Sequence, residues 1–594
     1  MEHVNECSGY ALGAVGAVTL CLLYLLLRTD AEAPVPYRVA PPAQAQPGWR
    51  GVVLQEPTLK VSGSALIQCY APATGEALGH VHPSTAAGID RAIARAKAAQ
   101  VPWARTTFAE RRRVLRTMLR FLLENQATIA RVACLDSGKT MVDAALGEIL
   151  VTAEKLRWTI RHGEESLQNE RRPTNLLMAY KWNEVVYQPL GVVAACVSWN
   201  YVFHNLLSPI IASIFAGNAI VVKGSEATAW SSSYFASIAT RALEVCGHSP
   251  DIVQSLVCWP HVADHLTSHP DIAHITFIGS RPVAHLVCAS AARALTPVCV
   301  ELGGKDPAIV LDDLSDGDFR RVASILMRGT FQSAGQNCIG IERVVALPNV
   351  HDRLIDHLTP KIRALKPGSI LTASPDTPVD VGASISSAGF DNLEALIQDA
   401  VDHGARLLAG GKRYTHPDHP SGHYFTPTFL ADVTPDMKIA QTELFAPVFL
   451  LMRATSVTNA IEIANSTVYA LGASVYGTAT ADLERVVRDV HAGMVAVNDF
   501  AVTYMVQLPF GGVKGSGYGR FAGKEGLRSL CNQKAVTRDR WPGVKTSIPP
   551  PMDIPLRGSG AGERAWSMAQ GIVWLGYAPD WRGKLRGLRG VVGM

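Results

Sequence analysis

Short apolar runs bounded by glycine or polar residues alternate with helical patterns through the first half of the chain. Helical spacing covers stretches such as Ala86–Ala99 and Glu110–Ala133. The apolar runs, each followed by a helical pattern, are Gly191–Trp199, Asn218–Lys223, Ile252–Cys258 and His274–Ser280. This repeated order of strand, turn and helix predicts an α/β fold with a parallel, doubly wound sheet. Ligands bind beyond the carboxyl ends of the strands in such sheets, which is where the sequences SWN, KGSE and IGS lie.

An uncharged apolar run lies near the start of the chain. Cys7–Leu27 contains 21 residues without a charged side chain, and at 1.5 Å rise per residue it just crosses a hydrocarbon core of about 30 Å. The pattern predicts a transmembrane helix over residues 8–27. A cleaved signal peptide is the alternative, suggested by residues 31–33, although Glu2 and Glu6 precede the run and no Lys or Arg does.

Charge and cysteine content bear on where the rest of the chain resides. Arg28, Arg38 and Arg50 all follow the apolar run, so the positive-inside rule predicts that the body faces the cytosol. The 11 cysteines show no CxxC pairs and no metal-ligand spacing, which favours reduced thiols in a reducing compartment. A net charge of +4 argues against a nucleic-acid-binding surface spread over the whole molecule. We expect a single-pass protein of the endoplasmic reticulum membrane.

Unusual segments flank the predicted body on both sides. Prolines between residues 30 and 50 predict an extended spacer, and we expect the folded body to begin near Val61. Towards the other end, residues 563–577 form a helical pattern too short to span a bilayer. Its neighbouring aromatic and basic residues are Trp566, Trp574, Trp581, Arg582, Lys584, Arg586 and Arg589. This tail could lie on an anionic leaflet or dock as a helix on its own protein.

The segment Phe331–Gly340 (FQSAGQNCIG) contains a candidate nucleophile. Taken alone, Cys338 fits a small buried core residue as well as a reactive thiol. Three further stretches accompany it: VELGGKDPAIV (Val300–Val310), ELFAPV (Glu443–Val448) and LPFGGVKGSGYGR (Leu508–Arg520). In this order and spacing they resemble the aldehyde dehydrogenase superfamily, over roughly residues 61–540. The apolar N-terminal run, the sequence FIGSRPVAH and the extra tail are most similar to the membrane-anchored branch of fungi and plants, one of whose names refers to meiotic sister-chromatid recombination.

The resemblance implies three catalytic residues. Cys338 matches the nucleophile, whose thiolate adds to an aldehyde carbonyl so that hydride can leave the resulting tetrahedral carbon. The Asn200 side chain and the Cys338 backbone N–H match the donors that hold the oxyanion. Glu301 matches the general base that activates water to cleave the thioester. Without the resemblance, Glu301 would be interpreted as an exposed carboxylate at a strand end.

The resemblance also implies a nicotinamide cofactor and no metal. The matching cofactor-binding positions are Trp199, Lys223, Glu226, Gly279, Ser280, Leu302, Glu443 and Phe445. A carboxylate at Glu226 would accept a hydrogen bond from a ribose 2′-hydroxyl and repel a 2′-phosphate, so we expect NAD rather than NADP. Gly279 and Ser280 open a predicted helix, whose free N–H groups favour the pyrophosphate.

Some positions depart from the family pattern. Ser198 replaces the proline before the Trp-Asn pair, and Ala446 replaces the glycine of the ELFGP motif. Because these changes mostly exchange one small residue for another, we expect cofactor binding to persist with altered mobility. Pro209 occupies a position where many relatives carry a lysine proposed to relay protons, so no relay residue is assigned.

The expected architecture is the aldehyde dehydrogenase fold preceded by the transmembrane helix. The residue ranges are 28–60 for a linker, 61–300 for a Rossmann-like NAD-binding domain, 301–515 for an α/β catalytic domain, 516–540 for an arm strand and 541–594 for the tail. A hairpin at about 176–190 resembles the arm through which relatives pair, which implies a homodimer or homotetramer. An ordinary edge hairpin is the alternative.

These features together predict NAD-dependent oxidation of aldehydes, membrane-derived or fatty ones, to carboxylic acids. A catalytically idle membrane-tethered scaffold and an acylating dehydrogenase that uses coenzyme A are the alternatives. Retention of Cys338, Glu301 and Asn200 together disfavours the scaffold. Glu301 disfavours the acylating enzyme, because its role is to activate water. The identity and chain length of the aldehyde are not readable from the sequence.

Overall fold

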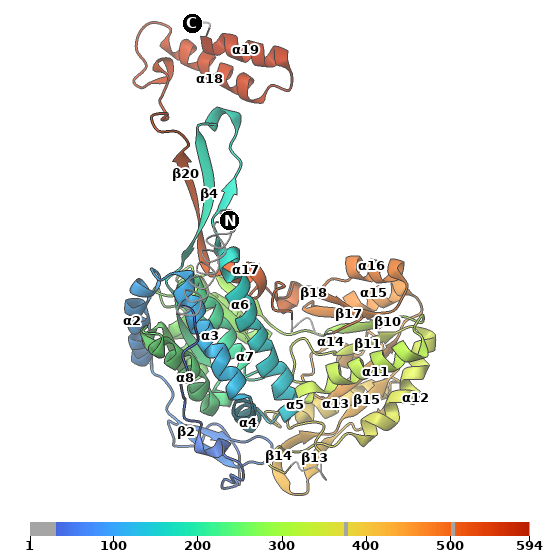
Figure 1. Ribbon diagram of the computed structural model, residues 1–594. Coiled ribbons are helices and arrows are strands. Elements are labelled where there is room, and N and C mark those ends of the chain that lie inside the picture. Colours follow the sequence, from blue (N-terminus) through green and yellow to red (C-terminus); the bar gives the residue numbers. More distant parts are fainter. Residues whose placement is uncertain (1–30, 373–377, 501–504, 593–594) are drawn as a thin grey trace, which may run out of the picture. The chain divides into compact units, whose positions relative to one another are not determined.

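The computed structural model describes residues 31–372, 378–500 and 505–592 (Figure 1). The predicted transmembrane helix over residues 8–27 lies outside these ranges. Within them, no helix combines the length and the apolar content that crossing a membrane requires. The described chain forms two compact units, one of residues up to Leu167 together with Pro189–Cys531, the other of Gln168–Gln188 together with residues from Asn532 onward.

The first unit contains a six-stranded sheet in the order β19-β9-β8-β5-β6-β7. Its strands are β5 (Val192–Cys196), β6 (Ala219–Gly224), β7 (Val253–Val257), β8 (Ile275–Ile278), β9 (Val298–Glu301) and β19 (Gly517–Tyr518). All neighbours are parallel except β19, which pairs antiparallel with β9. The four predicted apolar runs are therefore confirmed as strands of a parallel sheet.

Helices of the first unit pack on this sheet and on one another, among them α2, α7 and α8 (Figure 1). They are α2 (Ala86–Trp103), α3 (Phe108–Glu124), α4 (Gln126–Ser137), α5 (Met141–Ala144), α6 (Val151–Leu167), α7 (His204–Ala216), α8 (Ala229–Val245), α9 (Pro260–Thr267), α10 (Arg281–Ala292) and α17 (Gly523–Ser529). The helical pattern predicted over 110–133 is confirmed, but it forms two helices rather than one. Asn125 separates α3 from α4 and donates its side-chain amide to the Phe121 carbonyl at 2.8 Å, a local bond that competes with helix continuation.

A second sheet in the same unit has seven strands in the order β12-β15-β16-β11-β10-β17-β18. They are β10 (Pro307–Val310), β11 (Arg343–Ala346), β12 (Arg406–Ala409), β15 (Thr428–Ala431), β16 (Val448–Arg453), β17 (Gly472–Tyr476) and β18 (Met494–Val497). Ile309 and Val345 pack into one apolar cluster, whereas their neighbours Val310 and Val344 pack into another. Both faces are thus buried, as is typical of parallel sheets.

The remaining elements of this unit cover the second sheet or form small hairpins. The helices are α11 (Asp316–Phe331), α12 (Pro348–Ala364), α13 (Phe390–Asp402), α14 (Lys438–Gln441), α15 (Val457–Asn465) and α16 (Thr480–Asp489). The hairpin strands are β1 (Ile67–Tyr70), β2 (Ala77–Val81), β13 (Arg413–His416) and β14 (His419–Phe425).

The segment predicted as a spacer is packed along the body, although much of it is extended as expected. Glu32 forms an ion pair with Arg112 of α3 at 2.6 Å. Tyr37 stacks on Phe121 with ring centroids 4.8 Å apart, and its hydroxyl donates to the Ile238 carbonyl at 2.9 Å. Contacts with the body therefore begin well before Val61, because an aromatic ring and a carboxylate in the segment have partners on the helices.

The second unit consists of a three-stranded sheet and two helices. The strands, in the order β20-β4-β3, are β3 (Glu170–Arg172), β4 (Lys181–Pro189) and β20 (Cys531–Asp539). The hairpin predicted at 176–190 differs in detail, because Leu176–Met178 form a 3₁₀ turn and β4 pairs with β3, Glu170 opposite Val185. The helical pattern predicted in the tail is confirmed as α18 (Ala561–Tyr577), which packs against α19 (Trp581–Val592).

Candidate active site

The predicted site residues of the first sheet lie at one edge. Asn200 and Trp199 follow β5, Lys223 and Glu226 lie at the end of β6, Gly279 and Ser280 follow β8, and Glu301 and Leu302 lie at the end of β9. Because these strands are parallel neighbours, their carboxyl ends meet at the same edge. The sheet alone therefore gathers eight residues that are dispersed over about a hundred positions of sequence.

Cys338 reaches this edge from a tight turn between α11 and β11. Ser333, Ala334 and Gly335 all have positive φ angles, of 54°, 56° and 73°. A Cβ atom on Gly335 would lie 2.0 Å from the Ala446 carbonyl oxygen, so only glycine fits there. The turn brings Cys338 into a cavity that Glu301 also lines.

Glu301 and Cys338 line the same cavity and influence each other's ionisation. Burial raises the pKa of Glu301 to about 7, and a hydrogen bond of 3.0 Å from the Gly303 N–H opposes that rise. Burial raises the pKa of the Cys338 thiol well above its ordinary value, and the negative charge of Glu301 adds to the effect. At neutral pH the thiol is therefore protonated beside a carboxylate of near-neutral pKa, which is the arrangement of a nucleophile and its base.

The Asn200 side chain is fixed by hydrogen bonds to both ends of its amide. Its oxygen accepts from the Ser198 hydroxyl at 2.7 Å and from the Asn205 amide at 3.2 Å. Its nitrogen donates to the Gln336 carbonyl, two residues before Cys338, at 3.3 Å. With the oxygen occupied twice, the amide nitrogen is held towards the Cys338 turn, and its second N–H remains for an oxyanion. Sequence reasoning missed Asn205 and treated Ser198 only as a departure from the family.

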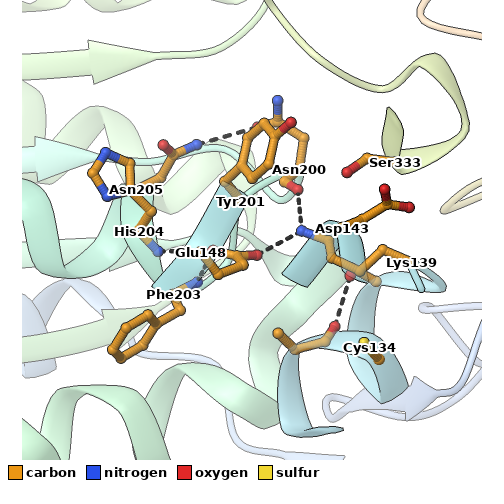
Figure 2. A network of polar contacts seen from close by, with 12 residues as sticks. Cys134, Lys139, Asp143, Glu148, Asn200, Tyr201, Phe203, His204, Asn205 and Ser333 are labelled. Carbon is orange, nitrogen blue, oxygen red and sulfur yellow. Dashed lines mark hydrogen bonds and ion pairs between the residues drawn. The ribbon is translucent and has the colours of Figure 1, made fainter. Parts of the chain in front are cut away.

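A buried ion pair supports the backbone of the Asn200 loop (Figure 2). The Lys139 ammonium lies 2.5 Å from a carboxylate oxygen of Glu148 and 2.7 Å from the Asn200 carbonyl oxygen. The other Glu148 oxygen accepts the backbone N–H groups of Phe203 and His204, where α7 begins, at 3.0 and 2.9 Å. These residues were also missed. Their signal in the sequence is a carboxylate inside an otherwise apolar helical stretch, ALGEILV.

The predicted adenosine and pyrophosphate positions form two separate features. The Lys223 ammonium lies 3.0 Å from a carboxylate oxygen of Glu226. Ser280 precedes the first turn of α10 without a side-chain cap on its N–H groups, which leaves those donors available for an anion. Leu302 is held by a 3.1 Å bond from its N–H to the Ser516 carbonyl.

A predicted cofactor-binding residue that follows the first sheet meets one that precedes β16 of the second sheet. Trp199 and Phe445 contact edge to face, with ring centroids 5.6 Å apart. Phe445 has a φ angle of 52°, a strained value for an aromatic residue, of the kind that gathers at functional sites. Glu443 accepts the Gly304 N–H at 3.1 Å, and burial together with the charges of Glu342 and Glu301 raises the pKa of Glu443 to about 9.

No cluster of three or more His, Cys, Asp or Glu side chains suited to a metal ion occurs among the residues that the structure describes.

Comparison with known proteins agrees with the geometry of the site. A model of the aldehyde dehydrogenase family matches residues 60–536. An aldehyde dehydrogenase-like protein of Schizosaccharomyces pombe is 51% identical over 523 residues, which cover 87% of this chain and 98% of the relative. An aldehyde dehydrogenase-like protein of Saccharomyces cerevisiae is 48% identical over 575 residues, 94% of this chain and 88% of the relative. An NADP(+) succinate-semialdehyde dehydrogenase of Mycobacterium avium is 32% identical, with 78% and 95% covered.

Solved structures agree with the fold. The crystal structure of a Mycobacterium tuberculosis aldehyde dehydrogenase complexed with NAD+ superimposes with a TM-score of 0.74 at 29% sequence identity, covering 82% of this chain and 97% of that one. The predicted α/β aldehyde dehydrogenase fold is thereby confirmed. Family match, close relatives and fold all cover the sheet edge where Cys338, Glu301 and Asn200 meet. The chain therefore belongs to the aldehyde dehydrogenase family.

Proposed function

We propose that this protein oxidises aldehydes to carboxylic acids with NAD as the hydride acceptor. The observation that carries the proposal is the placement of Cys338 and Glu301 in one cavity, with an Asn200 amide of fixed orientation directed at the Cys338 turn. A thiol nucleophile, a base of near-neutral pKa and an oxyanion donor are the groups that chemistry through an acyl-enzyme needs.

The chain's own residues account for both halves of the reaction. Glu301 takes the thiol proton, and the Cys338 sulfur bonds to the aldehyde carbon while the carbonyl electron pair moves to oxygen. The Asn200 amide and the Cys338 N–H hold that oxyanion. A bound nicotinamide would accept the hydride that leaves the carbon, so that a thioester remains on Cys338. Glu301 then releases that proton to solvent and deprotonates a water molecule. The water oxygen bonds to the thioester carbon, and the Cys338 thiolate leaves.

Two features support NAD as the cofactor. The uncapped first turn of α10 suits a pyrophosphate. The Glu226 carboxylate at the end of β6 favours a ribose 2′-hydroxyl over a 2′-phosphate. Similar proteins do not decide between NAD and NADP. The Mycobacterium tuberculosis structure contains NAD+, whereas the Mycobacterium avium relative is named for NADP(+). The choice of NAD therefore depends on Glu226.

We also propose that the body is held at the cytosolic face of the endoplasmic reticulum membrane and acts there as a homodimer or homotetramer on lipid-derived aldehydes. The uncharged run Cys7–Leu27 and the arginines after it support the anchor and its orientation. Largely apolar walls of the cavity support an aldehyde with a hydrocarbon body. Assembly through the arm that contains β4 rests on the resemblance described above.

Steady-state formation of NADH by the purified protein across a panel of aldehydes tests the proposed reaction. Turnover without coenzyme A, with the free acid as product, is the expected result. Turnover that requires coenzyme A would favour the acylating alternative, and absence of turnover with every aldehyde would favour the scaffold. The same assay with NADP in place of NAD measures the cofactor preference directly.

A further inference from the structure

Two helices line one side of the active-site cavity with residues at helical spacing. Gly147 and Val151 belong to the π-helical turn Ala145–Leu150 and the start of α6, and Lys155 lies one turn further along α6. His204 and Ser208 line the cavity from α7, four residues apart. Residues separated by four positions lie on the same face of a helix, so each helix presents one row of side chains to the cavity.

Lys155 is a buried cation without a partner. Only 1% of its surface is exposed, and its ammonium has no hydrogen-bond partner within the described residues. Burial lowers the pKa of Lys155 to about 8. The Trp158 ring lies 5.9 Å from the ammonium, and the pKa of nearby His204 is lowered to about 3 by burial and by Lys155 itself. An unpaired buried ammonium is costly, so such groups normally face an anion.

The other buried lysines of the described chain follow that rule. Lys139 pairs with Glu148 at 2.5 Å and Lys305 pairs with Glu342 at 2.7 Å. Lys155 is equally buried and has no such carboxylate. It differs from both in lining the active-site cavity, where a ligand could supply the missing charge.

The position of Lys155 along the cavity separates it from the reacting carbon. Gly147 marks the catalytic end, because a Cβ atom there would lie 2.2 Å from the Tyr201 ring, next to Asn200. Lys155 is eight residues, or about two turns, further along the same helical segment. The apolar residues that line the cavity include Val151, Ile278, Met494, Val506, Phe510 and Phe521.

We propose that Lys155 binds a carboxylate at the far end of the substrate, so that the preferred aldehydes are oxo acids with an apolar chain between the two groups. This inference rests on the proposed aldehyde oxidation and names its substrate class. An aldehyde at Cys338 would extend along the apolar walls and place its distal carboxylate at the ammonium, and Ser208 adds a hydroxyl donor to the lining of the same cavity. One cation matches one anionic group, and charge-assisted hydrogen bonds in a buried site are strong.

Paired substrates of equal length test this inference. For each chain length, kcat/KM is measured with the aldehyde that ends in a methyl group and with the one that ends in a carboxylate. We expect wild type to prefer the carboxylate at the length that reaches Lys155. In Lys155→Met this preference should fall by roughly 30-fold or more, the usual consequence of removing one partner of a buried charge pair. Lys155→Arg, which keeps the charge, should retain part of it.

Two controls separate binding from folding. Lys97→Met removes a surface lysine that pairs with Asp271 at 2.6 Å, and it should leave the preference unchanged. Lys155→Met should unfold at a higher temperature than wild type, because it removes an unpaired buried charge, whereas loss of a structural lysine would lower that temperature.

Two outcomes would contradict the role of Lys155 and leave the proposed aldehyde oxidation valid. They are a wild-type preference for the methyl-ended aldehyde at every length, or a preference that Lys155→Met does not change. Absence of turnover with both members of every pair would instead contradict the proposed reaction itself.

Discussion

The ammonium of Lys139 lies 2.5 Å from a carboxylate oxygen of Glu148, and both side chains are almost completely buried. Lys139 also holds the carbonyl of Asn200, while Glu148 holds the N–H groups at the start of α7. Glu148→Gln keeps an oxygen for those N–H groups but leaves the Lys139 charge without its counterion. We expect a loss of about 3–5 kcal/mol in the free energy of unfolding and a lower kcat, because Asn200 loses its support.

Denaturant unfolding and steady-state kinetics measure these two effects. Lys139→Met combined with Glu148→Gln removes both charges and should recover part of the stability, since neither charge is then left buried alone. If the ion pair positions Asn200, kcat of the double variant should stay low although its stability improves. Full recovery of kcat together with stability would show that the pair acts only on folding.

Cys338 is expected to be indispensable for turnover. Cys338→Ala removes the sulfur that bonds to the aldehyde carbon, so NADH formation should fall to background while NAD binding, measured by calorimetry, persists. Cys246→Ala provides a matched control, because Cys246 lies at the end of α8 and lines no part of the active-site cavity. Turnover that survives in Cys338→Ala would contradict the mechanism.

Glu301 should impose a pH dependence on catalysis. A base must be ionised to accept a proton, and burial raises the pKa of Glu301 to about 7. Activity should therefore rise with pH and level off above about 7. In Glu301→Gln we expect a burst of NADH followed by a stalled acyl-enzyme, with the slow residual rate lacking this rise. An unaltered pH profile in that variant would assign the titration to another group.

The same raised pKa has a consequence for stability. The pKa of this carboxyl is about 4.5 in the unfolded chain and about 7 in the folded protein, so its neutral form favours the folded state. Ionising it therefore lowers the free energy of unfolding, and this loss develops as pH rises from about 4.5 to above 7. Relative to Glu301→Gln, wild type should lose about 3 kcal/mol of unfolding free energy as pH rises through this window. Denaturant titrations of both proteins at pH 4.5 and pH 8 give the difference.

The sequence was informative where chemistry follows a strand and uninformative where it depends on distant segments. Parallel pairing brings Asn200, Lys223 and Ser280 to one edge, so predicting their strands was enough to gather them, whereas Glu301 was assigned through the family resemblance. Cys338 needed the family resemblance, because its turn reaches that edge from the second half of the chain.

The supports of the site could not be predicted in the same way. Lys139 meets Asn200, and Glu148 meets Phe203, only through tertiary packing across 61 and 55 residues of sequence. In sequence, Lys155 resembles an ordinary surface cation of an amphipathic helix, yet in the fold it is buried. The packing of Tyr37 on Phe121 was missed for a related reason, since a proline-rich composition predicts an extended backbone without showing what that backbone contacts.

Glu226 should control the choice between NAD and NADP. Its carboxylate lies 3.0 Å from the Lys223 ammonium and would repel a 2′-phosphate. Glu226→Ser removes the repulsion and frees the lysine, so the ratio of kcat/KM for NADP to that for NAD should rise by roughly tenfold or more. Glu244→Ser, on the exposed surface of α8, should leave the ratio unchanged. Equal use of both cofactors by wild type would show that Glu226 does not face the ribose.

The helical hairpin α18–α19 is expected to bind anionic membranes. Its helices pack through small residues, because a Cβ atom on Gly587 would lie 2.3 Å from the Leu575 nitrogen. Large apolar side chains face outward instead, with Trp566, Tyr577 and Trp581 each about two-thirds exposed. Small residues inside and large apolar residues outside are typical of helices in lipid. Basic residues complete a surface suited to an anionic leaflet, namely Arg564, Arg582, Lys584, Arg586 and Arg589.

A protein that begins at residue 31 tests the hairpin without the predicted transmembrane helix. It should sediment with vesicles that contain phosphatidylserine but not with vesicles of phosphatidylcholine alone, and salt should weaken the binding because the attraction is electrostatic. Replacing Trp566 and Trp581 with serine should release it from the vesicles, whereas replacing Trp158, inside the first unit, should not affect binding. The shortened protein could instead bind neither kind of vesicle and form oligomers that these two serine substitutions dissociate. That result would show that the exposed aromatic surface joins two copies of the chain.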